Sequence, residues 1–152
     1  MALVQRDHIL RLIEAIAAAI ARSRKRKNDG ELVAARLELH QATMELLGPA
    51  AAMATMVDVR TAANLVSDAQ RLRLWCRLLA EDSALLTELG RTREAAAADR
   101  RIVELMLESW QREKEWDDQS LEHFAEARAR GGADQLDPAF RALLTACDAE
   151  RR

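Results

Sequence analysis

The chain has 152 residues, enough for one domain with a single hydrophobic core. Hydrophobic residues make up 49% of the sequence, charged residues 32%, and only two prolines are present, so helix formers dominate and an all-α fold is predicted. The net charge of -2 excludes a global attraction to nucleic acid or to an anionic membrane, so any such role must come from a local patch.

About six helices are predicted. The first covers residues 3–27, because Ile9, Ile13, Ile16 and Ile20 form one apolar stripe, and it ends in the basic run RSRKRK at 22–27. An Asn-Asp-Gly turn follows, and a second helix covers residues 31–47 until Gly48-Pro49 stops it.

The third predicted helix covers residues 50–66, with an inner face of Met53, Met56, Val59, Ala63 and Val66. The fourth runs from 68 to 89 and is capped by Ser67-Asp68, with Trp75 in phase with its buried leucines. The fifth, residues 92–113, opens after a turn at Gly90.

The pattern weakens after Trp110. Gly131-Gly132 is predicted to be a flexible joint, and Asp137-Pro138 predicts the start of a terminal helix. The apolar side of that helix holds Phe140, Leu143, Leu144 and Cys147. The sequence therefore predicts a helical domain at residues 1–115 and a helical tail at 116–152, which docks either on the same domain or on a dimer partner.

A helical phrase that starts with glycine occurs twice, sixty residues apart. In the first copy, Gly30 precedes Ala35, Leu39 and Ala42 by five, nine and twelve residues. In the second, Gly90 precedes Ala95, Asp99 and Ile102 by the same offsets. Small residues at these offsets let one helix pack closely on the one before it, which predicts a bundle or short solenoid of helical hairpins.

The two phrases are similar to the second helices of tetratricopeptide repeats, although their separation exceeds the usual period of roughly 34 residues. The chain also resembles an uncharacterised bacterial family of small tetratricopeptide-like helical proteins. The resemblance lies in the opening DHILRLIE at 7–14, the hairpin ending MELLG at 44–48 and the second hairpin at Gly90, and it covers about residues 4–112. It implies a fold and a bacterial source, and it brings no activity, substrate or site residue.

No catalytic, cofactor-binding or metal-binding residue is predicted, and we expect a protein that is not an enzyme. His8, His40 and His123 are scattered, and Cys76 and Cys147 lack metal-ligand spacing, so two free thiols are expected. With no secretory signal and no apolar run near the roughly 20 residues that span a bilayer, a cytoplasmic protein is expected.

Three local features have two interpretations each. The basic run could bind phosphates, but we interpret it as a solvated helix end. Nucleic-acid binding is therefore not expected. Methionines fill gaps in a core or line an adaptable groove, and the core is the prediction for Met44, Met53, Met56 and Met106. Candidate interaction residues are Trp110, Trp116, Phe140 and Leu144.

These observations favour a module that binds an unidentified protein partner or a second copy of itself. The alternative is a small-molecule or lipid carrier with a pocket between the third and fifth helices. An enclosed apolar cavity would favour the carrier, whereas an open groove would favour the binding module.

Overall fold

A computed structural model describes the backbone of residues 2–152 and the side chains from residue 6 onward. Over these residues the chain forms eight α-helices and one 3-10 helix, with no strand. They are α1 (Ala2–Asn28), α2 (Leu32–Leu47), η1 (Gly48–Ala50), α3 (Ala51–Ala54), α4 (Val59–Val66), α5 (Ala69–Glu88), α6 (Thr92–Arg112), α7 (Asp118–Ala129) and α8 (Pro138–Glu150). The all-α prediction is confirmed, and the predicted number of six helices is too low.

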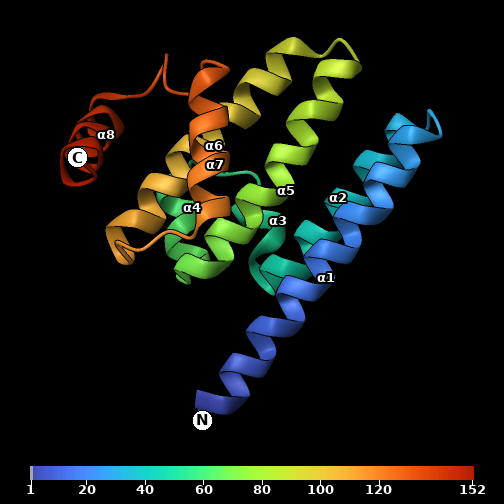
Figure 1. The fold of residues 1–152 in the computed structure, drawn as a ribbon, viewed down its shortest axis with the longest axis horizontal. Coiled ribbons are helices and arrows are strands. Elements are labelled where there is room, and N and C mark those ends of the chain that lie inside the picture. Colours follow the sequence, from blue (N-terminus) through green and yellow to red (C-terminus); the bar gives the residue numbers. More distant parts are fainter. Residues whose placement is uncertain (1) are drawn as a thin grey trace.

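Two helical hairpins form the body of the molecule. Helix α1 packs along α2, and α5 packs along α6. The hairpins meet through α2 and α5, and α6 then packs on α7. In Figure 1, α1, α5 and α7 form a layer toward the viewer, with α2 and α6 behind them.

The turns at Gly30 and Gly90 share one geometry. Each glycine and the residue after it donate backbone hydrogen bonds to the carbonyl oxygens three and five residues earlier, at 3.0 and 2.8 Å in the first turn and 3.1 and 2.9 Å in the second. This is the pattern of a Schellman C-cap, which requires a left-handed residue. The glycines have φ of +79° and +75°. A Cβ at either would meet no atom within 4 Å, so backbone conformation, rather than space, requires glycine here.

A third turn of this kind follows α7. Gly131 has φ +94°, and it and Gly132 donate to the carbonyls three and five residues earlier at 3.0 and 2.8 Å. Gly132 is buried, and a Cβ there would lie 2.6 Å from the carbonyl oxygen of Asp99 on α6. The two glycines predicted to be a flexible joint thus form a packed turn against α6.

Helix α6 is the centre of the core. Every residue from 102 to 110 is buried, because α4, α5, α7 and α8 all pack around this helix. Trp75 on α5 is 2% exposed and belongs to the same core, as its phase with the neighbouring leucines predicts. The core is continuous from Ile16 on α1 to Cys147 on α8.

The single helix predicted for residues 50–66 is wrong, because η1, α3 and α4 replace it. Asp58 ends the run by accepting a hydrogen bond from the backbone nitrogen of Thr61, which starts α4 as a new helix. Arg101 of α6 donates to the carbonyl oxygens of Ala54 at 2.7 Å and Val57 at 3.2 Å. The two carbonyl oxygens at the break therefore accept hydrogen bonds from a side chain of a different helix, α6.

The tail packs on its own chain. Asp137 caps α8 by accepting from the backbone nitrogen of Phe140, as the sequence predicts. Phe140 is 4% exposed and Cys147 is fully buried, and α8 lies against α6. On α7, the ring of Phe124 lies 4.9 Å from that of Trp116, whose indole nitrogen donates to the Ser109 hydroxyl of α6 at 3.1 Å.

Candidate functional site

The predicted repeat positions lie in the interior. Buried side chains fill five of the seven sites: Ala35, Leu39, Ala42, Ala95 and Ile102. The carbonyl oxygen of Ala35 also accepts a hydrogen bond from Ser23 of α1 at 3.0 Å, which brings the two helices together at this small residue. With Gly30 and Gly90 in the turns, these residues determine packing and do not form a surface.

The four candidate interaction residues do not form an open surface in this chain. Trp110 is 5% exposed and Phe140 4%, while Trp116 and Leu144 are half-buried. Helices α7 and α8 cover the apolar edge that follows Trp110.

The basic run is held by ion pairs within the chain. Arg22 pairs with Glu38 of α2 at 3.1 Å, and Arg24 pairs with Glu81 of α5. Arg26 pairs with Glu31 at 2.9 Å. These pairs are largely exposed and contribute little to stability. They do neutralise part of the run, which favours its interpretation as a helix end over a phosphate grip.

The methionine prediction is correct at one position of four. Met106 is fully buried in α6. Met44 on α2 is 37% exposed, and Met53 and Met56, beside the break after α3, are exposed by 60% and 85%.

The described residues hold few other groups that could form a reactive or metal-binding site. Cys76 and Cys147 are free and buried. No three residues of the His, Cys, Asp and Glu types among the described side chains are grouped so that they could hold a metal ion. No helix in the described range has the length and apolar character needed to cross a membrane.

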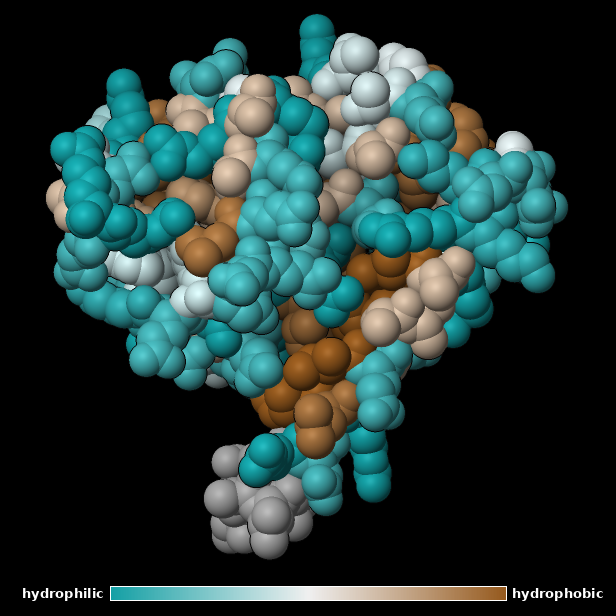
Figure 2. All heavy atoms as spheres, viewed as in Figure 1, coloured by the Kyte–Doolittle hydropathy of each residue, from teal (hydrophilic) through white to brown (hydrophobic). Residues whose placement is uncertain are grey.

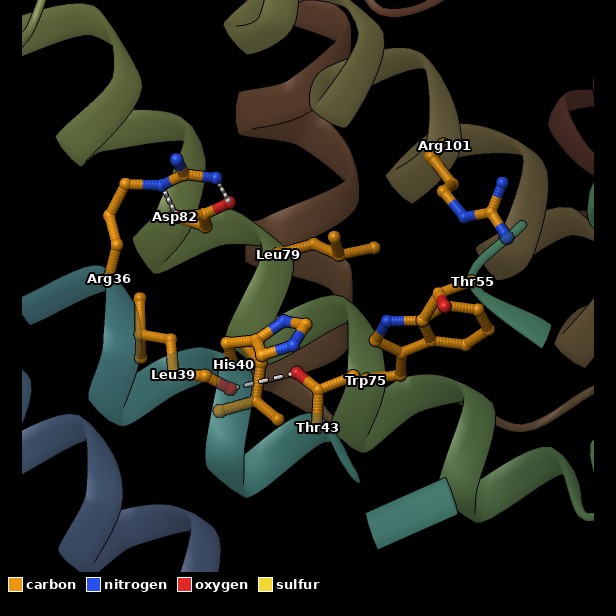
Figure 3. Close-up of a pocket in the computed structure, with 10 residues that line it drawn as sticks. Arg36, Leu39, His40, Thr43, Thr55, Trp75, Leu79, Asp82 and Arg101 are labelled. Carbon is orange, nitrogen blue, oxygen red and sulfur yellow. Dashed lines mark hydrogen bonds and ion pairs between the residues drawn. The ribbon is translucent and has the colours of Figure 1, made fainter. Parts of the chain in front are cut away.

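One pocket lies between α2, α5 and α6 and has a volume of about 170 Å³ (Figure 3). At one end Arg36 of α2 donates two hydrogen bonds to Asp82 of α5, at 2.7 and 3.1 Å. At the other, the Arg101 guanidinium lies 5.0 Å from the centre of the Trp75 ring. Burial lowers the pKa of Arg101, against the opposing charges of nearby acids, but the group remains a cation.

The lining of this Trp75 pocket is mixed, with six polar or charged residues and four apolar ones. In Figure 3 the imidazole of His40 and the indole of Trp75 border the same space, which opens to solvent beside His40, an exposed residue. The pocket is small and opens to solvent, so it does not match the enclosed apolar cavity that a lipid carrier requires.

A longer groove crosses the layer formed by α1, α5 and α7. It consists of three adjoining hollows: Gln70 of α5 lines all three, and Arg73 lines two of them. The hollow between α1 and the start of α5 has a volume of about 730 Å³, the one beside the α6–α7 connection about 690 Å³, and a cavity between them about 100 Å³. We call the whole feature the α1–α5–α7 groove.

The α1 end of this groove has an apolar wall formed by α1 and a charged rim. The isoleucine stripe of α1 is buried at Ile16 and Ile20, but Ile9 and Ile13 are only half-covered, and Leu10 is 48% exposed. Figure 2 shows the corresponding brown surface in the hollow between α1 and the body of the molecule. The amino-terminal part of α1 extends past the other helices (Figure 1), and among its described side chains Ile9 and Leu10 keep part of their surface open to solvent.

The α7 end of the groove is polar and holds two half-buried cations. Arg73 and Arg77 lie one turn apart on α5, and Arg73 donates to Glu113 at 3.1 Å. Asp117 caps α7 through Ser120. Burial alone raises the pKa of Asp117, but the hydrogen bonds from Ser120 and the charges of both arginines outweigh it and hold the pKa below its usual value.

The sequence analysis did not single out Arg73 and Arg77. The available signal was their spacing, since two cations at i and i+4 lie beside the leucines of a helix predicted to be buried over a wide arc. Such cations are placed at the edge of the core, where part of each guanidinium loses contact with water.

Comparison with protein-family models, with curated proteins and with solved structures gives no match for this chain.

Proposed function

We propose that this chain is a tetratricopeptide-like module that binds a segment of a partner protein in the α1–α5–α7 groove and carries out no catalysis. The observation that carries this proposal is the groove itself, open along one layer of helices and apolar at its α1 end.

The order of helix packing supports the tetratricopeptide-like part of the proposal. The first helices of successive hairpins, α1 and α5, are neighbours, and α5 is in turn a neighbour of α7. The second helix of each hairpin packs on the first helix of the next, as α2 does on α5 and α6 on α7. In a solenoid of hairpins, this arrangement lines one face with first helices, and that face commonly binds peptides.

The shape of the openings favours a protein partner over a small molecule. The Trp75 pocket is small, whereas the groove is long and open and combines apolar and charged surface. An exposed apolar patch with a polar rim is typical of a protein interaction site.

Selection from a random 12-residue peptide library tests this proposal. We expect enriched peptides whose affinity, measured by fluorescence anisotropy, falls about tenfold or more for Leu10→Glu, because a charge then lies in the apolar end of the groove.

Leu37→Glu is the matched control. Leu37 is a leucine on α2 with a similar exposed fraction, 55% against 48%, and it lies outside the groove. Both substitutions should leave the fold intact, which circular dichroism can verify. If no peptide is enriched, or if Leu37→Glu weakens binding as much as Leu10→Glu, the proposed function is wrong.

A further inference from the structure

Three buried side-chain nitrogens in the described part of the chain have no hydrogen-bond partner, and all belong to α5 or α7. They are Nη1 of Arg73, Nε of Arg77 and Nδ1 of His123. The two arginines line the cavity of about 100 Å³ in the middle of the groove, with Ile13 and Leu74 as its apolar walls. Two guanidinium groups therefore border the cavity, and each has one N–H group without an acceptor among the described residues.

Buried donors without an acceptor are rare in proteins, because each has lost its bond to water without gaining another. A guanidinium presents its N–H groups in a fixed planar fork, which matches the oxygens of a carboxylate. Arg73 is only 14% exposed at its side chain, so an acceptor here would make hydrogen bonds that water screens weakly.

The charges around the cavity select the kind of acceptor. Glu113 bonds to Arg73, and Asp117 lies close enough to both arginines for them to lower its pKa, so two acids offset two cations. These acids repel any anion, and they repel a phosphate, with a charge of about −1.5 to −2, more strongly than a carboxylate. A carboxylate carries a single charge, and the walls formed by Ile13 and Leu74 suit the methylene groups of a glutamate side chain.

We propose that the cavity between Arg73 and Arg77 binds the side-chain carboxylate of a glutamate in an acidic segment of the partner protein. This inference rests on the proposed function and specifies the chemistry of the partner that the groove recognises.

Nuclear magnetic resonance of the arginine Nε–H groups tests the site directly in the full chain. The probe is the glutamate side chain alone, as N-acetyl-glutamic acid α-amide, titrated against ¹⁵N-labelled protein. We expect a saturable shift of the Arg77 Nε–H signal. N-acetyl-glutamine amide, which has the same shape without the charge, should bind about tenfold more weakly or not at all.

Arg77→Lys keeps the positive charge and removes the Nε donor, so it should weaken the response of the Arg73 signal about tenfold. Arg141→Lys, on the exposed side of α8, is the matched control and should change nothing. The carboxylate site is refuted if the glutamate probe causes no saturable shift in the wild-type protein, if the glutamine probe shifts Arg77 equally, or if inorganic phosphate binds more tightly.

The two proposals fail separately. Library peptides that bind the groove without an acidic residue and without sensitivity to Arg77→Lys would overturn the carboxylate site and leave the proposed function in place. A saturable glutamate response with no enriched peptide would support the site and overturn the function.

Discussion

Replacement of Gly132 by alanine should destabilise the protein more than replacement of any turn glycine that faces open space. A Cβ at Gly132 would lie 2.6 Å from the Asp99 carbonyl oxygen and 2.8 Å from that of Ala127. Ordinary contacts begin at 3.4 Å, so the Asp99 oxygen must move away by about 0.8 Å. Both contacts are backbone atoms of packed helices, and neither can rotate away as a side chain would.

Overpacking of this kind costs about 1–3 kcal/mol, which in a chain of this size lowers the melting temperature by roughly 3–10 °C. The cost extends to α5, because the buried Asp99 carboxylate accepts from Ser83 at 2.7 Å and from Arg130 at 3.0 Å. A shift of the turn separates Arg130 from Asp99 and leaves a buried carboxylate with one partner fewer.

Urea unfolding followed by circular dichroism measures the effect, with Gly90→Ala as the comparison. Gly90→Ala meets no atom within 4 Å and costs only the strain of a left-handed alanine, about 1–2 kcal/mol. An equal m-value with a lower midpoint for Gly132→Ala than for Gly90→Ala is the expected result. If Gly132→Ala is the more stable of the two, the turn does not pack on α6 as described.

Three further predictions concern α6 and α7. Ala95→Leu should lower the free energy of unfolding by about 1–3 kcal/mol, because Ala95 is buried. Ala97→Leu, on the exposed face of the same helix, should change it by less than about 0.5 kcal/mol. Equal melting temperatures for the two variants would contradict the repeat alignment. Burial raises the pKa of the Glu104 carboxyl group in the folded protein, so this group stabilises the fold fully below the pKa of the unfolded chain and ceases to do so as the pH rises through the pKa of the folded protein. Glu104→Gln should therefore raise the melting temperature more at pH 7 than at pH 4. The reverse order would refute this prediction. Burial lowers the pKa of the His123 imidazole in the folded protein, against the charge of Glu126, so the unfolded chain is protonated first and the free energy of unfolding falls as the pH drops below about 6.5. In His123→Gln the urea midpoint should fall less between pH 7 and pH 5 than in the wild-type protein. An unchanged slope would count against this prediction.

The helices that the sequence predicts well are those with long apolar stripes and clear ends. The isoleucine stripe of α1 and the glycine turns place the first two helices within one residue of their observed bounds. Likewise, the cap of α8 at Asp137 is local chemistry, in which an aspartate and the helix that it starts are adjacent in the chain.

Residues 50–66 show why a stripe alone is insufficient. Met53, Met56 and Val59 continue a helical period, but the period says nothing about whether one helix continues or two begin in the same phase. The local signal for a break was Asp58, an N-cap residue in the middle of the run. The partner that stabilises the break, Arg101, lies more than forty residues away and has no signature in the sequence.

The groove could not be predicted from the sequence either, because it depends on which helices lie in the same layer. Burial of α1 at Ile16 and its exposure at Leu10 follow from the length of α1 relative to α2 and α5, not from the composition of the stripe, which is apolar throughout. The unpaired nitrogens of Arg73 and Arg77 likewise arise only once α7 covers the edge of α5.

The irregular spacing of the turns has a structural explanation that bears on the groove. Sixty residues separate Gly30 from Gly90, and forty-one separate Gly90 from Gly131, although all three turns share one hydrogen-bond pattern. The difference of nineteen equals the length of the segment from 48 to 66 that forms η1, α3 and α4. That segment packs on α2 and α6, in the layer behind α1, α5 and α7. The segment lengthens the first interval without separating α1 from α5, so the layer that lines the groove is continuous although the turns are unevenly spaced.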